Sequence, residues 1–217
     1  MIRAILFDLG NVLVPVDFVR CRAALAEVCV HPPKEVQRIL VESGLPMRYE
    51  SGEVSSADFF DATCRLLDMN VSYEKFAAVW GEIFAPEPLV PESLLEALRA
   101  RHRLVLLSNT NDMHFTVAEA RYPLLRHFDE FVLSYKVGAM KPQPRIYQLA
   151  IAAAGCAAEE CFFVDDLEEN VAAARREGID AAVFTTLEQL RADLKFRHIE
   201  PHASPGIPHP TARYFGP

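Results

Sequence analysis

Five short apolar runs constrain the fold of this 217-residue chain more than any other feature of its sequence. Each run has the length of a buried strand, and segments with helical periodicity flank the runs. Strands that alternate with helices predict a parallel sheet covered by helices on both faces. We therefore expect an α/β fold, a Rossmann-like three-layer sandwich. The runs cover residues 4–7, 104–107, 131–133, 161–164 and 181–184.

A long insertion without any strand-like run separates the first two predicted strands. Its helical candidates cover residues 18–28, 34–42, 56–67 and 73–84. The pair Ser55 and Asp58 resembles a capping box, and the Pro-rich stretch at 85–91 is typical of a linker that leads into a helix at 92–101. We predict an all-helical cap domain at 15–88, inserted into a core domain made of residues 1–14 and 89–199. The Pro-rich tail at 200–217 shows neither periodicity, so we expect it to be extended or disordered.

Charge and cysteine content narrow the partners and the compartment. The formal net charge of −8 gives no electrostatic reason for binding nucleic acid or an anionic membrane, so we expect neither as a partner. The five cysteines are odd in number and none stands in a CxxC pair, which is typical of reduced thiols in a cytoplasmic protein. Asp8 interrupts the first apolar run too early for a signal peptide or a membrane span. We expect a monomer or a weak homodimer.

Polar residues follow the predicted strands at the points where function is expected. Ligands of open parallel sheets bind at the carboxyl ends of the strands. The candidates in chain order are Asp8, Gly10 and Asn11 after the first strand, Ser108 and Asn109 after the second, Lys141 after the third, and Asp165 and Asp166 after the fourth. Each of them alone also has an ordinary explanation, as a turn or helix cap, a loop residue or a solvated charge.

Taken together, these segments resemble a known family. Residues 7–13, 107–111, 140–142 and 163–166, with a helical insertion after the first of them, are similar to the four motifs of the haloacid dehalogenase (HAD) superfamily of hydrolases. Within that superfamily they look most like the small bacterial sugar-phosphate phosphatases typified by α-D-glucose-1-phosphate phosphatase, to which the cap segment at 49–55 is also similar. The resemblance covers nearly all of the chain except the tail.

The resemblance implies a phosphatase that acts on a small phosphorylated metabolite. Asp8 would attack phosphorus and form an aspartyl-phosphate, which splits the hydrolysis into two easier steps. Lys141 would neutralise both Asp8 and the phosphate. Ser108 and both the backbone and the side chain of Asn109 would donate hydrogen bonds to the phosphoryl oxygens, because charge spread over those oxygens must be stabilised electrostatically.

The resemblance also implies a Mg²⁺ cofactor. Its expected ligands are one oxygen of Asp8, the backbone carbonyl of Gly10, and Asp166, with Asp165 bound directly or through water. Oxygen ligands together with retained waters are what this ion prefers.

Other polar residues near the motifs have less certain roles. Asn170 either orients Asp166 or sits in the first turn of a helix, and both alternatives remain open. We expect Arg48, Tyr49 and Glu50 to lie at a solvated helix end, with contact to the substrate's leaving group as the alternative. His114 is expected to be a surface or core histidine rather than a catalyst.

Position 10 departs from the family pattern. Most phosphatases of the superfamily carry there a second aspartate, which protonates the leaving oxygen and later deprotonates the attacking water. Gly10 keeps the backbone carbonyl but has no such group, and general acid–base catalysis is worth about 10² to 10⁴ in rate. Three explanations stay open: the leaving group is already acidic, as in a sugar 1-phosphate; a water, Asn11 or a cap side chain substitutes; or the aspartyl-phosphate turns over slowly.

Two other functions compete with a phosphatase. A 2-haloacid dehalogenase also uses an aspartate nucleophile without the second aspartate. Resemblance to the dehalogenases, however, would imply a Tyr-Gly pair after the nucleophile and no need for Mg²⁺. The residues at 10–11 and the acidic pair at 165–166 speak against it. The absence of a carboxylate at Gly10 also suggests a catalytically weak protein that binds phosphate for regulation.

Overall fold

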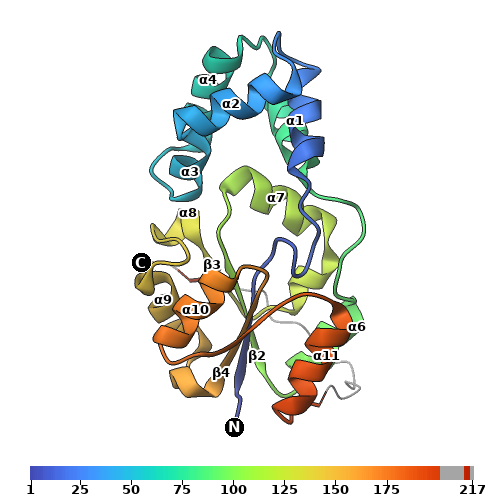
Figure 1. Ribbon diagram of the computed structural model, residues 1–217, viewed down its shortest axis with the longest axis vertical. Helices are drawn as coiled ribbons and strands as arrows, with labels where there is room; N and C mark the ends of the chain where they lie inside the picture. Colours follow the sequence, from blue (N-terminus) through green and yellow to red (C-terminus); the bar gives the residue numbers. More distant parts are fainter. Residues whose placement is uncertain (201–212, 216–217) are drawn as a thin grey trace.

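The computed structural model describes residues 1–200 and 213–215, and its centre is a parallel sheet (Figure 1). The strand order is β5-β4-β1-β2-β3-β6. All five predicted strands are present, so the predicted Rossmann-like α/β fold is confirmed. The strands are β1 Ala4–Phe7, β2 Arg103–Ser108, β3 Glu130–Leu133, β4 Cys161–Asp165, β5 Asp180–Val183 and β6 Arg213–Tyr214.

Helices cover both faces of the sheet because successive side chains of each strand point to opposite sides. In β1, Ile5 and Phe7 belong to one apolar cluster, whereas Ala4 and Leu6 belong to the other. The first cluster is completed by α6 Glu92–Arg99, α7 Asp112–Arg121 and α11 Leu187–Phe196. The second is completed by α8 Ser134–Val137, α9 Pro144–Ala154 and α10 Glu168–Arg176. The sandwich therefore has three layers.

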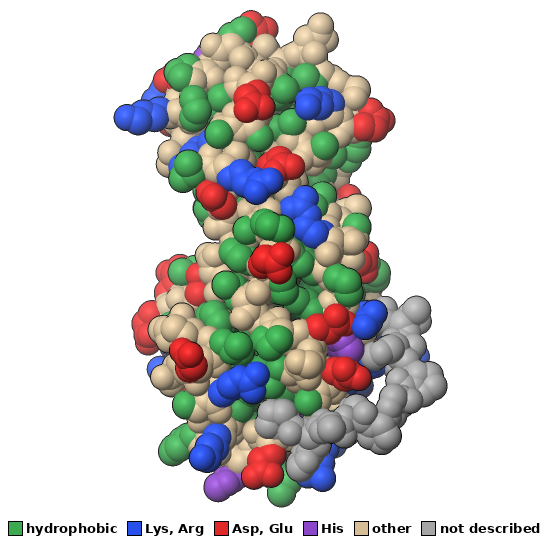
Figure 2. Space-filling view, turned by 90° about the vertical axis from the view of Figure 1, so that its right-hand side faces the viewer, with side chains coloured by type: hydrophobic (Ala, Val, Ile, Leu, Met, Phe, Trp, Pro, Cys, Tyr) green, Lys and Arg blue, Asp and Glu red, His purple; other side chains and the backbone are tan. Residues whose placement is uncertain are grey.

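The insertion between β1 and β2 is helical, as predicted. Helices α1 to α4 lie together beyond the sheet, above α7 and α8, and form the upper of two lobes in the space-filling view (Figures 1 and 2). The division into a cap at 15–88 and a core stays a prediction. The helices are α1 Phe18–Ala26, α2 Pro33–Ser43, α3 Leu45–Glu50, α4 Ser56–Leu67 and α5 Tyr73–Trp80.

The structure refines the predicted helices of the insertion. Ser55 caps α4 as expected, because its Oγ accepts a hydrogen bond from the amide of Asp58 at 3.2 Å. The helix predicted to reach residue 84 instead ends at Trp80 and continues as a 3₁₀ turn over Gly81–Ile83. Helix α3 was not predicted, because six residues are too few to show a helical period.

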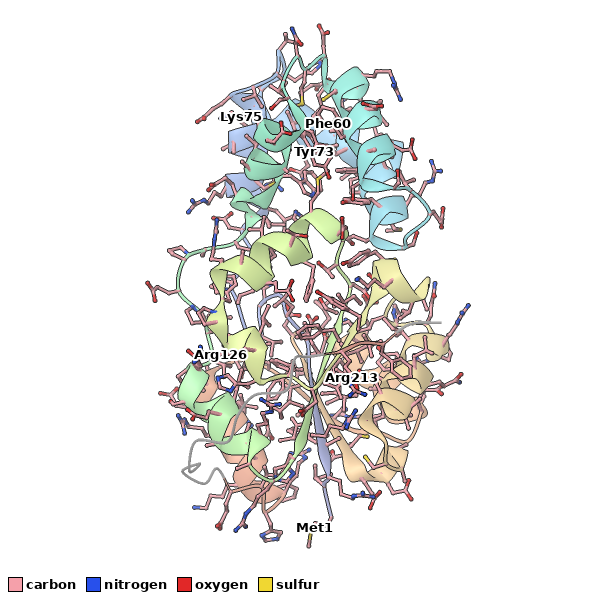
Figure 3. The ribbon with its side chains drawn as sticks, turned by 180° about the vertical axis from the view of Figure 1, so that it is seen from behind. Met1, Phe60, Tyr73, Lys75, Arg126 and Arg213 are labelled. Atoms are coloured by element: carbon pink, nitrogen blue, oxygen red, sulfur yellow. The ribbon has the colours of Figure 1, made fainter. Side chains whose placement is uncertain are left out.

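Aromatic side chains pack the insertion and connect it to the core. Phe60 and Tyr73 contact each other far from the sheet, with ring centroids 5.5 Å apart (Figure 3). Trp80 lies between the two lobes: its ring is 4.9 Å from Phe59 of α4 and stacks on His114 of α7 at 5.0 Å. The apolar core is thus continuous from the cap helices to the sheet.

The end of the chain returns to the sheet. Arg213 and Tyr214 pair in parallel with Glu130 and Phe131 of β3 and form its edge strand. The Tyr214 hydroxyl donates a hydrogen bond to a carboxylate oxygen of Glu119 at 3.0 Å. Of the two alternatives expected for the tail, extended or disordered, this segment is extended, and its pairing depends on β3, about 80 residues earlier in the chain. Residues 201–212 and 216–217 of the predicted tail lie outside the described residues.

Two predictions about the chain's environment can be compared with the structure. All five cysteines have free thiols, as expected for reduced side chains. Among the described residues, no helix combines the length and the apolar character needed to cross a membrane.

Candidate active site

The carboxyl ends of β1 and β4 bring two aspartates together around one lysine. Phe7 pairs with Val164 in the register of these strands, so Asp8 and Asp165 follow side by side. Lys141, from the loop between α8 and α9, places its Nζ 2.7 Å from Asp8 Oδ1 and 2.6 Å from Asp165 Oδ2. The side chains of Lys141 and Asp165 are only 1% and 0% exposed. This is a buried, charged triad at the edge of the sheet where ligands bind.

Burial and mutual attraction decide the charges of this triad. Burial raises the pKa of Asp8 to about 6, and Lys141 opposes that increase. Burial by itself would lower the pKa of Lys141, but the two carboxylates outweigh it and raise that pKa above its usual value. At neutral pH the lysine is a cation and Asp8 is an ionised carboxylate, which is the state that a nucleophile requires.

Asp166 completes an acidic cluster next to the triad. One carboxylate oxygen each from Asp8, Asp165 and Asp166 lie within 4.8 Å of one another. Burial, and then the neighbouring Asp165, raise the pKa of Asp166, while a hydrogen bond from Asn11 Nδ2 at 3.3 Å acts in the opposite direction. Three carboxylates at this spacing are suited to a hard divalent cation. The residues present therefore fit a Mg²⁺ ion.

Asp165 is more fully engaged than its two neighbours. Its Oδ1 accepts hydrogen bonds from the Leu167 amide at 2.9 Å and from Asn170 Nδ2 at 3.0 Å, while Oδ2 contacts Lys141. Asn170 was expected either to orient Asp166 or merely to occupy a helical turn. In the structure it holds Asp165 instead, because the first turn of α10 folds back over the end of β4.

Ser108 and Asn109 lie at the end of β2, as predicted. Ser108 is buried, with 2% of its surface exposed. The side chain of Asn109 has a role that sequence reasoning missed: its Nδ2 donates to the Lys141 carbonyl at 2.9 Å and its Oδ1 accepts from the Lys141 amide at 2.8 Å. These two hydrogen bonds to the Lys141 backbone position the lysine. Only the folded chain brings the two residues together.

The turn after β1 brings Val16 close to Gly10 and Asn11. A Cβ atom on Gly10 would lie 3.0 Å from Cγ2 of Val16, closer than an ordinary contact. Asn11 adopts a positive φ of 55° and accepts a hydrogen bond from the Val16 amide at 3.1 Å. A side chain at position 10 would therefore require the Val16 side chain to shift slightly.

The end of α3 lies directly over the phosphate-binding loop predicted at 108–111. Ser134 Oγ is 2.6 Å from the carbonyl oxygen of Glu50 and 2.9 Å from that of Thr110, and it accepts a hydrogen bond from the Thr110 amide. The Tyr49 hydroxyl accepts from the amide of Met113 at 3.1 Å. Ser134 was missed, although it directly follows β3 and the rule that identified Asp8 also applies to it. These bonds join the end of α3 to the residues that follow β2 and β3.

His114 is a core residue, one of the two alternatives expected. Its ring lies 3.1 Å from the Trp80 carbonyl through Nε2 and 2.9 Å from Asn111 through Nδ1. Burial lowers its pKa to about 4, so the ring is neutral at pH 7. It fastens the cap to α7.

Comparisons with known proteins agree with this geometry. A family model described as haloacid dehalogenase-like hydrolase matches residues 2–178. D-ribitol-5-phosphate phosphatase from Bacteroides thetaiotaomicron is 27% identical over 177 residues, which are 79% of this chain and 86% of the relative. A HAD-family enzyme from the same species, solved with magnesium and inorganic phosphate, superposes with a TM-score of 0.79 at 28% identity, covering 86% of this chain and 96% of that one.

Similarity to a dehalogenase concerns the fold alone. L-2-haloacid dehalogenase from Xanthobacter autotrophicus has a TM-score of 0.60 at 17% identity, covering 98% of this chain and 94% of that one. The predicted superfamily is confirmed, whereas the narrower resemblance to α-D-glucose-1-phosphate phosphatase is not. Because the family model spans most of the sequence, this chain belongs to the haloacid dehalogenase-like hydrolase family.

Proposed function

We propose that this chain is a magnesium-dependent phosphatase that hydrolyses a small phosphorylated metabolite through an aspartyl-phosphate on Asp8. The observation that carries the proposal is the buried Lys141 between Asp8 and Asp165, with the carboxylate of Asp166 beside them. A protein of net charge −8 needs local positive charge to bind an anionic substrate. Lys141, and a metal ion held by the acidic cluster, would supply that charge at this edge of the sheet. Relatives that act on phosphate esters or were solved with magnesium and phosphate support it.

The residues of the acidic cluster have different roles in holding the metal. We assign Asp8, Asp166 and the backbone carbonyl of Gly10 as the direct ligands of Mg²⁺. The oxygens of Asp165 already accept hydrogen bonds from Lys141, Asn170 and a backbone amide, so Asp165 would hold the ion less directly than Asp8 and Asp166. When bound, Mg²⁺ supplies positive charge that lets a carboxylate approach a phosphate dianion.

The remaining side chains position the reacting groups. Asp8 attacks phosphorus with the oxygen that does not contact Lys141, and Lys141 balances the charge of Asp8 and of the incoming phosphoryl group. Asn109 holds the backbone of Lys141 through two hydrogen bonds, which keeps the ammonium group in place during turnover. Ser108 and the amide of Asn109 donate to the phosphoryl oxygens.

A sugar phosphate such as α-D-glucose 1-phosphate is the proposed substrate class. The motifs at 7–13 and 49–55 support it, as does the relative that acts on D-ribitol 5-phosphate, a phosphorylated polyol. A 1-phosphate has the more acidic leaving group and so needs less help from a proton donor than a 6-phosphate.

Steady-state hydrolysis with matched variants tests this function. Turnover of α-D-glucose 1-phosphate, glucose 6-phosphate, D-ribitol 5-phosphate and p-nitrophenyl phosphate is measured with Mg²⁺ and with EDTA. We expect Mg²⁺-dependent turnover that Asp8→Asn abolishes, because an amide is not a nucleophile. The control is Asp61→Asn, an exposed aspartate of α4, which should keep wild-type rates.

The same panel separates the competing functions. Release of chloride from 2-chloropropionate without any need for Mg²⁺ would indicate a dehalogenase. Binding of inorganic phosphate without turnover of any ester would indicate a regulatory phosphate-binding protein. Either result would overturn the proposal.

A further inference from the structure

Gly10 has no side chain that could supply the proton for the leaving oxygen. Hydrolysis on Asp8 needs a group that protonates the leaving oxygen and then takes a proton from water. The inference below rests on the proposed phosphatase function. Because residue 10 is a glycine, another side chain must do this work.

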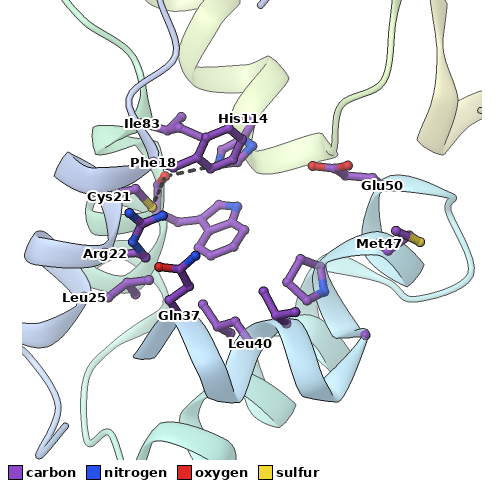
Figure 4. Close-up of a pocket in the computed structure, with 14 residues that line it drawn as sticks. Phe18, Cys21, Arg22, Leu25, Gln37, Leu40, Met47, Glu50, Ile83 and His114 are labelled. Atoms are coloured by element: carbon purple, nitrogen blue, oxygen red, sulfur yellow. Dashed lines mark hydrogen bonds between the residues drawn. The ribbon is translucent and has the colours of Figure 1, made fainter. Parts of the chain in front are cut away.

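A cavity of about 510 Å³ lies between the cap helices and α7 (Figure 4). Its walls are mostly apolar and include Phe18, Leu40, Met47 and Ile83. The Glu50 carboxylate extends into this space from the end of α3 (Figure 4). A carboxyl group thus faces a largely apolar cavity, which disfavours its charged form.

Hydrogen bonds join the cavity wall to the phosphate-binding loop. Ser134 Oγ bridges the backbone of Glu50 and that of Thr110, the residue after Asn109. On the opposite wall, His114 is bonded to Asn111 of the same loop. The cavity is therefore joined through these hydrogen bonds to residues 110–111, next to Ser108 and Asn109, and we place the leaving group of a bound ester in it.

The surroundings leave the Glu50 carboxyl group able to carry a proton at neutral pH. No hydrogen bond or ion pair of its side chain is present in the described part of the chain, and burial raises its pKa to about 7. The other titratable groups that line the cavity are Cys21 and Arg22 of α1 and His114 of α7. Helix α2 contributes no titratable lining residue, and α4 and α8 contribute none to the described lining. His114 is neutral at pH 7.

The nearby charged groups of α7, α8 and α3 itself are engaged in other contacts. Asp112 of α7 accepts a hydrogen bond from Ser56 at 3.0 Å, and Lys136 of α8 lies 3.6 Å from the centre of the Tyr214 ring. Arg48, on α3 itself, is paired with Glu53 at 3.4 Å. The environment of Glu50 is therefore set by burial rather than by a neighbouring charge.

We propose that Glu50, projecting from the cap into the cavity, is the general acid and base of the reaction in place of the group that Gly10 lacks. In the first step Asp8 forms a bond to phosphorus, the ester P–O bond breaks, and the Glu50 carboxyl proton passes to the leaving oxygen. In the second step water attacks the aspartyl-phosphate, Glu50 takes the water's proton, and the bond between phosphorus and Asp8 breaks. Glu50 is protonated again, and phosphate and the alcohol are the products.

A comparison of two aryl phosphates tests this role, because p-nitrophenolate leaves without protonation whereas phenolate needs it more. The measured quantity is kcat/KM with Mg²⁺, which reports the step in which the leaving group departs. We expect Glu50→Gln to lower kcat/KM for phenyl phosphate by about 10² or more and that for p-nitrophenyl phosphate by only a few-fold. Glu53→Gln, an exposed glutamate in the following turn, is the control and should match the wild type.

The pH profile gives a second readout that a purely structural role would not move. The wild-type kcat/KM for phenyl phosphate should fall above about pH 7, where Glu50 loses its proton, and Glu50→Gln should lack this fall. Equal losses on both esters, or an unchanged pH profile in the variant, would overturn the inference while leaving the phosphatase function intact. If the wild type hydrolyses neither ester, the proposed function fails, and the inference fails with it.

Discussion

Replacing Lys141 by Met should lower stability as well as activity. Methionine keeps most of the volume but removes the cation from between Asp8 and Asp165, which lie 2.7 and 2.6 Å from Nζ. Removing one partner of a buried ion pair leaves an uncompensated charge and typically costs about 3–5 kcal/mol. Since Asp165 is fully buried, we expect the free energy of unfolding to fall by about that amount, a large fraction of the roughly 5–15 kcal/mol of an ordinary domain.

Urea denaturation at pH 7 measures this loss, with turnover of p-nitrophenyl phosphate measured on the same preparations. Lys195→Met, an exposed lysine of α11, controls for the general effect of losing a lysine and should change stability by less than about 0.5 kcal/mol. The double variant Lys141→Met with Asp165→Asn removes one of the two stranded charges. It should regain part of the stability but none of the activity.

Three results would contradict the proposed role of Lys141. If Lys141→Met unfolds at the wild-type urea concentration, the lysine does not compensate two buried carboxylates in solution. If it is destabilised but Asp165→Asn recovers nothing, the loss comes from packing rather than from charge. Turnover near the wild-type rate would remove Lys141 from the catalytic site.

Three further changes test other parts of the structure. The contribution of His114 to stability should fall by about 3 kcal/mol as the pH decreases from 6.5 to 4, because burial keeps the folded-state pKa of His114 near 4 while the unfolded chain binds the proton at about 6.5. The raised pKa values of Asp8 and Glu50 act in the opposite direction, so the loss is measured as the difference between the wild type and His114→Gln in urea titrations at both pH values. Gly52→Ala should lower the melting temperature and disturb the cap, since its Cβ would lie 2.3 Å from the Tyr135 carbonyl oxygen, whereas Gly44→Ala, with a similar positive φ and no atom within 4 Å, should cost only the backbone strain. Asp166→Asn should raise the Mg²⁺ concentration needed for half-maximal turnover by an order of magnitude or more, and an unchanged requirement would exclude it as a ligand.

Much of the fold could be read from local patterns. The strands are short apolar runs, so their positions were predicted to within one or two residues, and the helix at 56–67 was predicted together with its Ser55 cap. Helix α3 and strand β6 were missed for different reasons. The helix is too short to show a period, and the strand exists only because it pairs with β3.

The candidate site divides in the same way. The rule that ligands meet the carboxyl ends of parallel strands identified Asp8, Asp165 and Asp166, because these residues directly follow apolar runs. The hydrogen-bond partners of these residues had no such signal. The bonds from Asn109 to the Lys141 backbone and from Asn170 to Asp165 depend on how the loops and the first turn of α10 pack.

Local patterns were enough to predict the layered α/β architecture, the helical insertion and the chemical types at the strand ends, since periodicity and strand-end position are local properties of a chain. Long-range contacts set which charges share the buried triad and where the Glu50 carboxylate points. Those outcomes depend on the register of β1 against β4 and on the packing of the cap against α7 and α8, which join segments far apart in the chain. Burial and electrostatic interaction follow from such contacts, so the pKa values of Asp8 and Glu50 became interpretable only once the fold was known.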